Sequence, residues 1–256
     1  MKHQPRKRFG QNFLKDPLVV DRLLNSLRLT ASDIVIEVGP GLGALTQPLL
    51  EQLDALTVIE IDRDLVAKLQ ARGLPGLTVL AGDVLNTDFT QLSVEPLRIV
   101  GNLPYNIGTP LLLRLLEAHS HLRDVHVMLQ KEVVDRLHAT VGSRAYGRLG
   151  VLMQSTFDIQ PLFTVPPEAF DPPPKVQSAI VRLKPLATAP TAAARKALEF
   201  ATRVAFANKR KTLRNNLREH LTAADLEALE INPQARAETL DADAFQRLAT
   251  ALAKLP

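Results

Sequence analysis

The sequence contains no cysteine and no tryptophan, and only eleven of its 256 residues are aromatic, nine Phe and two Tyr. The absence of cysteine excludes disulfide bonds, thiolate nucleophiles, zinc knuckles and iron–sulfur ligation. The six histidines form no ligand set, because no clustered carboxylates accompany them, and we expect no metal requirement. A chain without cysteine suits a reducing compartment, and we expect a cytoplasmic protein.

Long apolar runs and a strong net charge are also missing. No stretch approaches the roughly 18 uninterrupted apolar residues of a membrane helix. The basic start, Met1 to Arg8, continues into Phe9–Asn12 and not into the apolar core of a signal peptide, so we expect a mature protein without membrane association. The net charge of +4 decides nothing about a polyanionic partner, since many proteins without one share it.

The remaining composition, 46% hydrophobic and 23% charged, excludes disorder and predicts one or two globular domains. Short β-branched runs recur along the first half, each followed by a helical pattern, which indicates a parallel sheet with helical crossovers. Asp16 and Pro17 mark the start of a helix ahead of this sheet. The expected strands are Ile34–Val38, Leu56–Ile61, Leu77–Leu80, Leu97–Val100 and Val125–Leu129.

The pattern changes near Thr156. Two further strands, Phe157–Gln160 and Lys175–Leu183, are separated by a proline-rich stretch too irregular for a crossover helix, so we expect an antiparallel pair closing the sheet edge. After a linker at Pro185–Pro190 every pattern is helical. We predict an α/β domain over residues 1–184 and a small helical domain over residues 190–256.

A glycine-rich turn, Glu37–Gly43, directly follows the first strand of the predicted sheet and precedes a helix. Glycines in this context let a nucleotide-bearing ligand approach the backbone. Glu60 and Asp83 end the next two strands, where they can meet a ribose and an adenine amino group. The three features outline an adenosine site.

The turn leaves the identity of the adenosine cofactor open. Gly39, Gly41 and Ala44 satisfy the dinucleotide pattern, so NAD is an alternative. Glu37 favours S-adenosylmethionine, because the sulfonium and amino groups of that cofactor are cationic and its site holds no pyrophosphate.

A second motif, Gly101–Ile107, lies at the end of the fourth strand and contains Asn-Leu-Pro-Tyr at Asn102–Tyr105. It resembles the catalytic motif of S-adenosylmethionine-dependent adenine-N6 methyltransferases. With four other motifs, the chain resembles the KsgA/RsmA family of small-subunit ribosomal RNA adenine dimethyltransferases. These other motifs are Gln11–Leu14, Glu37–Gly43, Phe170–Val176 and Lys209–Leu217.

The resemblance implies a Rossmann-like methyltransferase fold with a small helical C-terminal domain, and it implies roles for individual residues. The Asn102 side-chain oxygen and the Leu103 carbonyl would accept the two protons of the adenine amine, and Pro104 would help to fix the turn. Tyr105 and Phe170 would stack on the unstacked base, although Phe170 has the alternative of packing beneath its loop. The N-terminal segment would form a lid over the cofactor or, from its composition alone, a flexible basic arm. The expected cofactor contacts are Gln11, Asn12, Leu14, Glu37, Gly39, Gly41, Glu60, Ile61, Asp83, Val84 and Asn102.

The positive charge is concentrated in one segment. Between Arg195 and His220 eight Lys or Arg face two Glu, a local net charge of +6 that exceeds that of the whole chain. If the segment is helical on both sides of Asn208, Arg210, Arg214 and Arg218 share one face. A charge run is usually just solvated, but beside an adenine-methylating domain it predicts RNA contact, which the N-terminal Lys2, Arg6, Lys7 and Arg8 would extend. The expected RNA-binding residues are Arg203, Lys209, Arg210, Lys211, Arg214 and Arg218.

The resemblance thus implies dimethylation of N6 on two adjacent adenosines near the 3′ end of small-subunit (16S) rRNA. The expected partner is small-subunit rRNA or a 30S assembly intermediate, and we expect a monomer. Three alternatives remain: a resistance-type methyltransferase of large-subunit rRNA, a nucleic-acid-binding assembly factor without turnover, and an NAD-dependent dehydrogenase.

Overall fold

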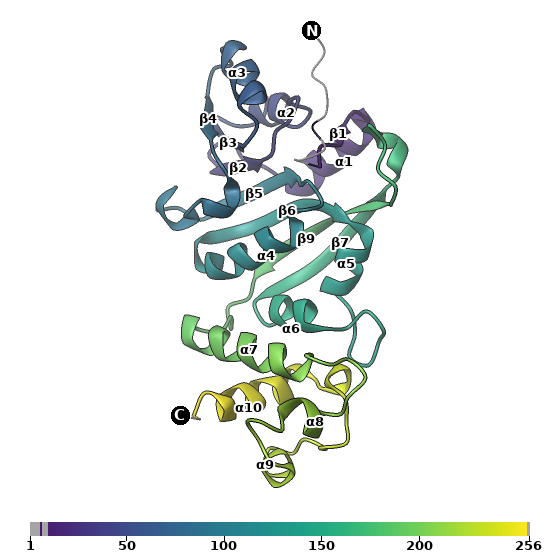
Figure 1. Cartoon of the computed structure of the whole chain (residues 1–256). Helices are drawn as coiled ribbons and strands as arrows, with labels where there is room; N and C mark the ends of the chain where they lie inside the picture. Colours follow the sequence, from purple (N-terminus) through teal and green to yellow (C-terminus); the bar gives the residue numbers. More distant parts are fainter. Residues whose placement is uncertain (1–5, 7–9, 255–256) are drawn as a thin grey trace. The chain divides into compact units, whose positions relative to one another are not determined.

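The computed structural model describes Arg6 and residues 10–254, and its chain divides into two compact units (Figure 1). The first unit comprises Met1–Val134 and Gln160–Pro185. The second comprises Asp135–Ile159 and Leu186–Pro256. In the part of the chain that the structure describes, no helix is long and apolar enough to cross a membrane.

A mostly parallel sheet of seven strands dominates the fold, in the order β4-β3-β2-β5-β6-β9-β7. All five predicted parallel strands are confirmed, with ends shifted by three residues or fewer. The expected Rossmann-like α/β fold is therefore confirmed. The strands are β2 (Val35–Val38), β3 (Leu56–Glu60), β4 (Leu77–Ala81), β5 (Leu97–Asn102), β6 (Leu122–Gln130), β7 (Phe157–Val165) and β9 (Ser178–Pro185).

The antiparallel strand of the sheet is β9, which pairs with β6 in the register Val127↔Val181. It lies one strand in from the edge, and β7 forms the edge itself. The predicted first strand of this pair ended at Gln160, but β7 continues through Pro161 to Val165. An edge strand tolerates proline, because the missing N–H costs a ladder hydrogen bond only in the sheet interior.

As predicted, one helix precedes the sheet and others follow its strands. Asp16 caps the first of them, accepting a hydrogen bond from Leu18 N at 2.9 Å, and Pro17 occupies the first helical position. The helices that begin in this unit are α1 (Pro17–Leu27), α2 (Thr46–Leu50), α3 (Arg63–Ala71), α4 (Gly108–Glu117) and α5 (Lys131–Leu137). Single 3₁₀ turns lie at Val84–Asn86, Phe89–Gln91, His119–His121 and Pro167–Ala169.

A separate two-stranded sheet joins two motifs that are far apart in the sequence. Strand β1 (Phe13–Leu14) pairs antiparallel with β8 (Phe170–Asp171), in the register Leu14↔Phe170. Lys15 N donates to Ala169 O at 2.9 Å and continues this contact. The N-terminal segment is thereby held beside the proline-rich loop.

The amino ends of the parallel strands carry a buried ion network. Arg98, at the start of β5, donates to Asp124 from Nε at 2.9 Å and to Asp33 from Nη1 at 2.8 Å. Its remaining nitrogen donates to the Leu27 carbonyl, and Arg123 adds a second contact to Asp33. Each of these buried carboxylates therefore has a cation beside it.

The second unit is mainly helical and has its own aromatic core. Phe206 stacks on Phe245 at 5.6 Å between ring centroids and meets the edge of Tyr146 at 6.5 Å. The Tyr146 hydroxyl donates to Leu240 O at 3.1 Å, so residues 135–159 pack with residues 186–256. The predicted division had one boundary near residue 185 and placed residues 135–159 in the first domain, whereas the structure groups them with the second unit. The elements are α6 (Arg148–Gln154), α7 (Ala192–Ala205), α8 (Leu213–Leu217), α9 (Ala223–Ala228), the 3₁₀ turn Ala237–Thr239 and α10 (Ala242–Leu252).

Candidate active site

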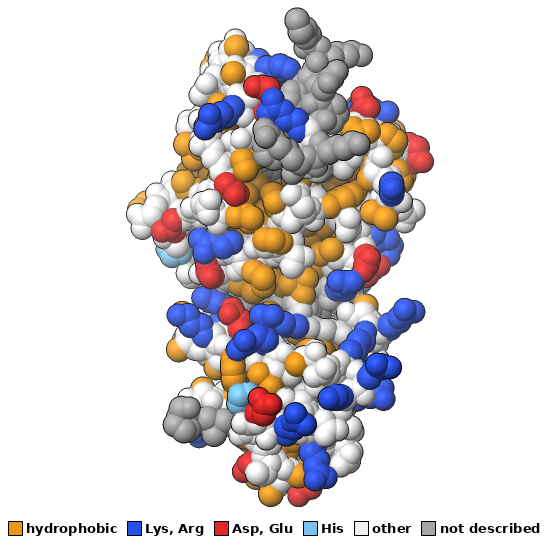
Figure 2. Space-filling model, in the orientation of Figure 1, with side chains coloured by type: hydrophobic (Ala, Val, Ile, Leu, Met, Phe, Trp, Pro, Cys, Tyr) orange, Lys and Arg blue, Asp and Glu red, His pale blue; other side chains and the backbone are white. Residues whose placement is uncertain are grey.

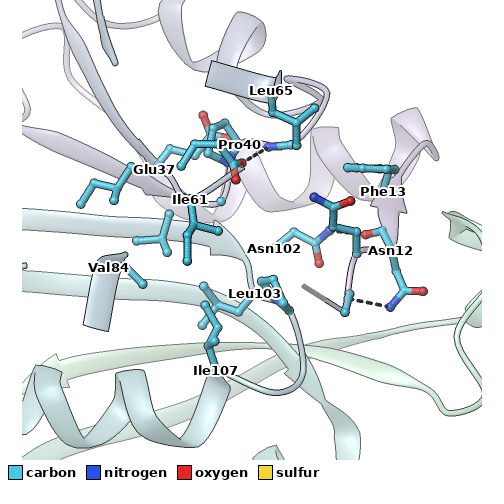
Figure 3. Close-up of a pocket in the computed structure, with 18 of the residues that line it drawn as sticks. Asn12, Phe13, Glu37, Pro40, Ile61, Leu65, Val84, Asn102, Leu103 and Ile107 are labelled. Atoms are coloured by element: carbon cyan, nitrogen blue, oxygen red, sulfur yellow. Dashed lines mark hydrogen bonds between the residues drawn. The ribbon is translucent and has the colours of Figure 1, made fainter. Parts of the chain in front are cut away.

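A cavity of about 440 Å³ opens at the carboxyl ends of β2, β3, β4 and β5, within the first unit. Figure 3 shows its lining, with Asn12 and Phe13 on one side and Val84 on the other. Every residue of the predicted cofactor and catalytic sets lines this one cavity: Gln11, Asn12, Leu14, Glu37, Gly39, Gly41, Glu60, Ile61, Asp83, Val84, Asn102, Leu103, Pro104, Tyr105 and Phe170.

The glycine turn enters the cavity with backbone that other residues rarely adopt. Gly39 and Gly41 have φ values of +67° and +59°, in the left-handed region. A side chain at Gly41 would also place its Cβ 3.0 Å from the Phe13 ring. Glycine is thus needed here both for the turn and for the close approach of the N-terminal segment.

Glu60 connects the turn to the end of β3. Its carboxylate accepts from Gly41 N at 3.2 Å and from Asp62 N at 2.8 Å. Burial raises the pKa of Glu60, although the hydrogen bonds from Asp62 and Gly41 oppose the shift. A carboxylate has about four lone-pair sites, so this arrangement keeps acceptor capacity for a ligand's hydroxyl groups.

Two further acidic side chains reach the cavity. Glu37 is almost fully buried and accepts from Thr46 Oγ1 at 2.7 Å, and burial raises its pKa to about 8. Asp83 accepts from Leu85 N at 2.9 Å, at the start of a 3₁₀ turn. Among the described residues, neither Glu37 nor Glu60 is paired with Lys or Arg, so a cationic ligand meets no competing charge there.

Asn102 ends β5 with its side-chain amide oriented by the N-terminal segment. Its Nδ2 donates to the Asn12 carbonyl at 3.0 Å. In the described part of the chain, Asn102 Oδ1 and the Leu103 carbonyl accept no hydrogen bond. Because a carbonyl can only accept, the contact with Asn12 identifies Nδ2 and leaves Oδ1 available.

The two predicted stacking residues differ in accessibility. The Tyr105 hydroxyl is hydrogen-bonded to Ser178 Oγ at 2.8 Å, and burial raises the pKa of the phenol. Phe170 lines the cavity wall but is only 1% exposed, within a core that includes Leu14 and Ile180. The ring packs beneath its loop, which was the alternative expected for it, and a base could reach it only through the cavity.

The predicted RNA-binding side chains all lie exposed in the second unit, while Leu213 and Leu217 between them are buried. Figure 2 shows many Lys and Arg side chains over the part that holds this unit. The expected helical face shared by Arg210, Arg214 and Arg218 is wrong for Arg210, because α8 begins only at Leu213 and Arg210 lies in the preceding turn.

The proposed N-terminal extension of the basic surface has a different outcome. Lys2, Lys7 and Arg8 lie outside the described residues. Arg6 is described, and its guanidinium contacts Asp62 and Asp64 at the start of α3. In this structure Arg6 is therefore paired within the protein.

Some cavity residues were missed by the sequence analysis. Phe13, Leu65 and Ile107 line the cavity but belong to no predicted set. Asp62, two residues after Glu60, is fully buried and holds the N-terminal segment. Its position just after the end of β3, close to Glu60, could have indicated that it lies at the site. In the described chain no group of three His, Asp or Glu is arranged to hold a metal ion.

Comparisons with known proteins agree with this geometry. Residues 2–254 match the family model described as ribosomal RNA adenine dimethylase. The chain is 51% identical over 253 residues, 98% of this chain and 96% of the relative, to "Ribosomal RNA small subunit methyltransferase A" of Bordetella petrii. A dimethyladenosine transferase from Plasmodium falciparum has a similar structure, with a TM-score of 0.79 and 28% identity over 92% of this chain and 95% of that one. The 23S rRNA methyltransferase ErmE is also similar, with a TM-score of 0.71 and 27% identity over 94% and 99% of the two chains.

Proposed function

Because this chain belongs to the ribosomal RNA adenine dimethylase family, we propose that it dimethylates N6 of two adjacent adenosines near the 3′ end of small-subunit (16S) rRNA. The methyl donor is S-adenosyl-L-methionine, and the reaction accompanies small-subunit assembly in the cytoplasm. The observation that carries the proposal is the free Oδ1 of Asn102 at a cavity that also contains Glu60 and Asp83.

The cavity suits S-adenosylmethionine in size and charge. Its volume of about 440 Å³ lies in the usual range for cofactor sites. Glu60 would hold the ribose and Asp83 the adenine, while Gly39 and Gly41 admit the ligand close to the backbone. Glu37 would favour the cationic end. When bound, this cofactor supplies a methyl group already activated by the sulfonium charge. The remaining contacts in this proposal are Gln11, Asn12, Leu14, Ile61, Val84 and Asn102.

The chain's own catalytic work is orientation of the target amine. Asn102 Oδ1 and the Leu103 carbonyl accept the two amine protons, which directs the nitrogen lone pair toward the methyl group. They also stabilise the positive charge that develops on nitrogen as the new bond forms. No general base is needed, because the proton can leave to water after transfer.

The base must leave its stack to reach Asn102, and an aromatic face compensates for part of that loss. Tyr105 supplies this face, held by its hydrogen bond to Ser178. Phe170, whose ring packs beneath its loop, forms part of the wall of the cavity that receives the base. The RNA backbone binds as a polyanion to the exposed residues Arg203, Lys209, Arg210, Lys211, Arg214 and Arg218.

The relatives named above favour small-subunit rRNA as the substrate over large-subunit rRNA and over a dehydrogenase function. Large-subunit methylation has structural support from ErmE, but at 27% identity, against 51% for the small-subunit enzyme of Bordetella petrii. A dehydrogenase leaves Asn102–Tyr105 without a role. We propose that the protein acts as a monomer on rRNA or on a 30S assembly intermediate, without a metal ion.

Asn102→Ala tests the proposal. We expect methyl incorporation into small-subunit particles to fall by about 100-fold or more, because one of two amine acceptors is lost. RNA binding should change little. Asn25→Ala, at an exposed position of α1, is the matched control. Retained activity would disprove the acceptor role, and labelling of large-subunit RNA alone would disprove the substrate.

A further inference from the structure

The starting observation is Asp62, a fully buried carboxylate beside the cavity. Its Oδ1 accepts from Arg6 Nη1 at 2.9 Å and from Asp64 N at 3.1 Å. Its Oδ2 accepts from Gln11 Nε2 at 3.1 Å. A single buried side chain thus binds two residues of the N-terminal segment to the start of α3.

The Gln11 side chain is held at both ends of its amide. While Nε2 donates to Asp62, Oε1 accepts from Arg6 N at 2.8 Å. The resemblance to known methyltransferases implied that Gln11 contacts the cofactor. In the structure both polar ends of its side chain bind protein, so a cofactor contact from Gln11 would use its backbone or methylene groups, and its amide acts as a clasp between the segment and Asp62.

The clasp is one residue away from the contact that orients Asn102. Asn12 follows Gln11 directly, and its carbonyl accepts from Asn102 Nδ2. If Asn12 moved away, the Asn102 amide could turn over and present Nδ2 to the target amine. Two donors would then face each other, and the proton acceptor would be lost.

We propose that Asp62 is a positioning residue for methyl transfer, acting through the Gln11 clasp and the Asn12 carbonyl on the amide of Asn102. The inference rests on the proposed function, because it concerns the acceptor for that reaction. Asp62 also donates its N–H to Glu60, so the same residue joins the clasp to the carboxylate that would hold the ribose. Cofactor binding and amine orientation are thereby linked through one residue, whose backbone N–H contacts Glu60 and whose carboxylate contacts the clasp.

An exchange of groups between Gln11 and Asp62 tests this geometry. Gln11→Glu removes the donor of the bond to Asp62 and places two carboxylates side by side. Asp62→Asn removes the acceptor and places two amide nitrogens side by side. The double variant restores one donor and one acceptor with the two roles exchanged, and asparagine still caps α3. Gln52→Glu, an exposed glutamine after α2, controls for the added charge.

We expect each single variant to lower kcat about 10-fold at saturating S-adenosylmethionine, because a small displacement of a catalytic group is costly. The KM for small-subunit particles should change less than about 2-fold, and the double variant should recover kcat to within about 3-fold. The proposal would be overturned if the kcat of the double variant did not exceed that of the less active single variant. It would also be overturned if Gln11→Glu left kcat unchanged.

Hydrogen exchange of residues 10–14 in the free protein provides a readout without turnover. We expect slow exchange in the wild type, faster exchange in each single variant and slow exchange again in the double variant. Equal exchange in all four proteins would overturn the clasp. Failure of the wild type to methylate small-subunit particles would instead disprove the proposed function, and the exchange data would still decide the clasp.

Discussion

The two ends of the sheet bury carboxyl groups in opposite ways. At the amino end, Asp33 and Asp124 lie against Arg98. Burial alone would raise the pKa of Asp124, but contacts from His126 and Arg98 hold it well below its usual range. At the carboxyl end, Glu37 has a hydroxyl partner and no cation, and burial raises its pKa to about 8.

Carboxyl groups are buried at both ends of the sheet, and whether a cation lies beside a carboxyl group decides whether its pKa is lowered or raised. The amino end is a completed ion network that holds strands together. At the carboxyl end Asp62 is paired with Arg6, but among the described residues Glu37 and Glu60 are not paired with Lys or Arg, which weakens folding but suits a cationic ligand. Perturbed acidic groups of this second kind, in a cavity, are typical of functional sites.

Removing the cation from the amino end should have the largest effect. Arg98→Met leaves Asp33 and Asp124 buried without their main partner, and we expect a loss of about 3–5 kcal/mol in the free energy of unfolding at pH 7. Urea denaturation measures it. The loss should shrink in acid, where the two carboxyls become protonated. A loss below about 1 kcal/mol would show that the network contributes little.

Replacing Glu37 at the carboxyl end by an uncharged residue should increase the free energy of unfolding, the opposite of the effect of Arg98→Met. Glu37 loses its proton near pH 4.5 when unfolded and near 8 when folded, so the folded state holds an extra proton between these values. The contribution of protonated Glu37 to stability is therefore fully present below pH 4.5 and is lost as the pH rises through about 8, by roughly 5 kcal/mol at most. Glu37→Gln should remove this loss and be more stable than the wild type at pH 8. Parallel stability curves for the two proteins between pH 5 and 8 would contradict the assignment.

The smallest effect is expected at the rim of the amino-end network. Arg123 contacts Asp33, but its side chain is 54% exposed, so water screens the pair. Arg123→Gln should cost less than about 1 kcal/mol in the same urea assay. A cost equal to that of Arg98→Met would mean that exposure does not separate the two arginines.

Much of the site could be predicted because strand ends are local features. The glycines at Gly39 and Gly41 and the acids Glu60 and Asp83 each follow a β-branched run, and parallel strands bring their carboxyl ends to one edge. Sequence order alone was enough to place them around one cavity.

Contacts across long sequence separations could not be predicted. The burial of Phe170 depends on the pairing of β8 with β1, which lies more than 150 residues earlier. Residues 135–159 pack with the helical unit through Tyr146, whose partners lie at Phe206 and Leu240. Periodicity says which face of a segment is apolar, but not which distant segment covers it.

The sequence by itself determined the strand order along the chain, the glycine turn, the Asn102–Tyr105 motif and the concentration of basic charge after Arg195. These follow from local propensity and composition. Only the tertiary structure decided which polar atoms are paired and which are free. Asn102 Oδ1 is available because Asn12 takes its amide nitrogen, and Gln11 is a clasp because Asp62 is buried beside it. The pairing of a polar group depends on neighbours brought together by folding, so it cannot be inferred from residue type alone.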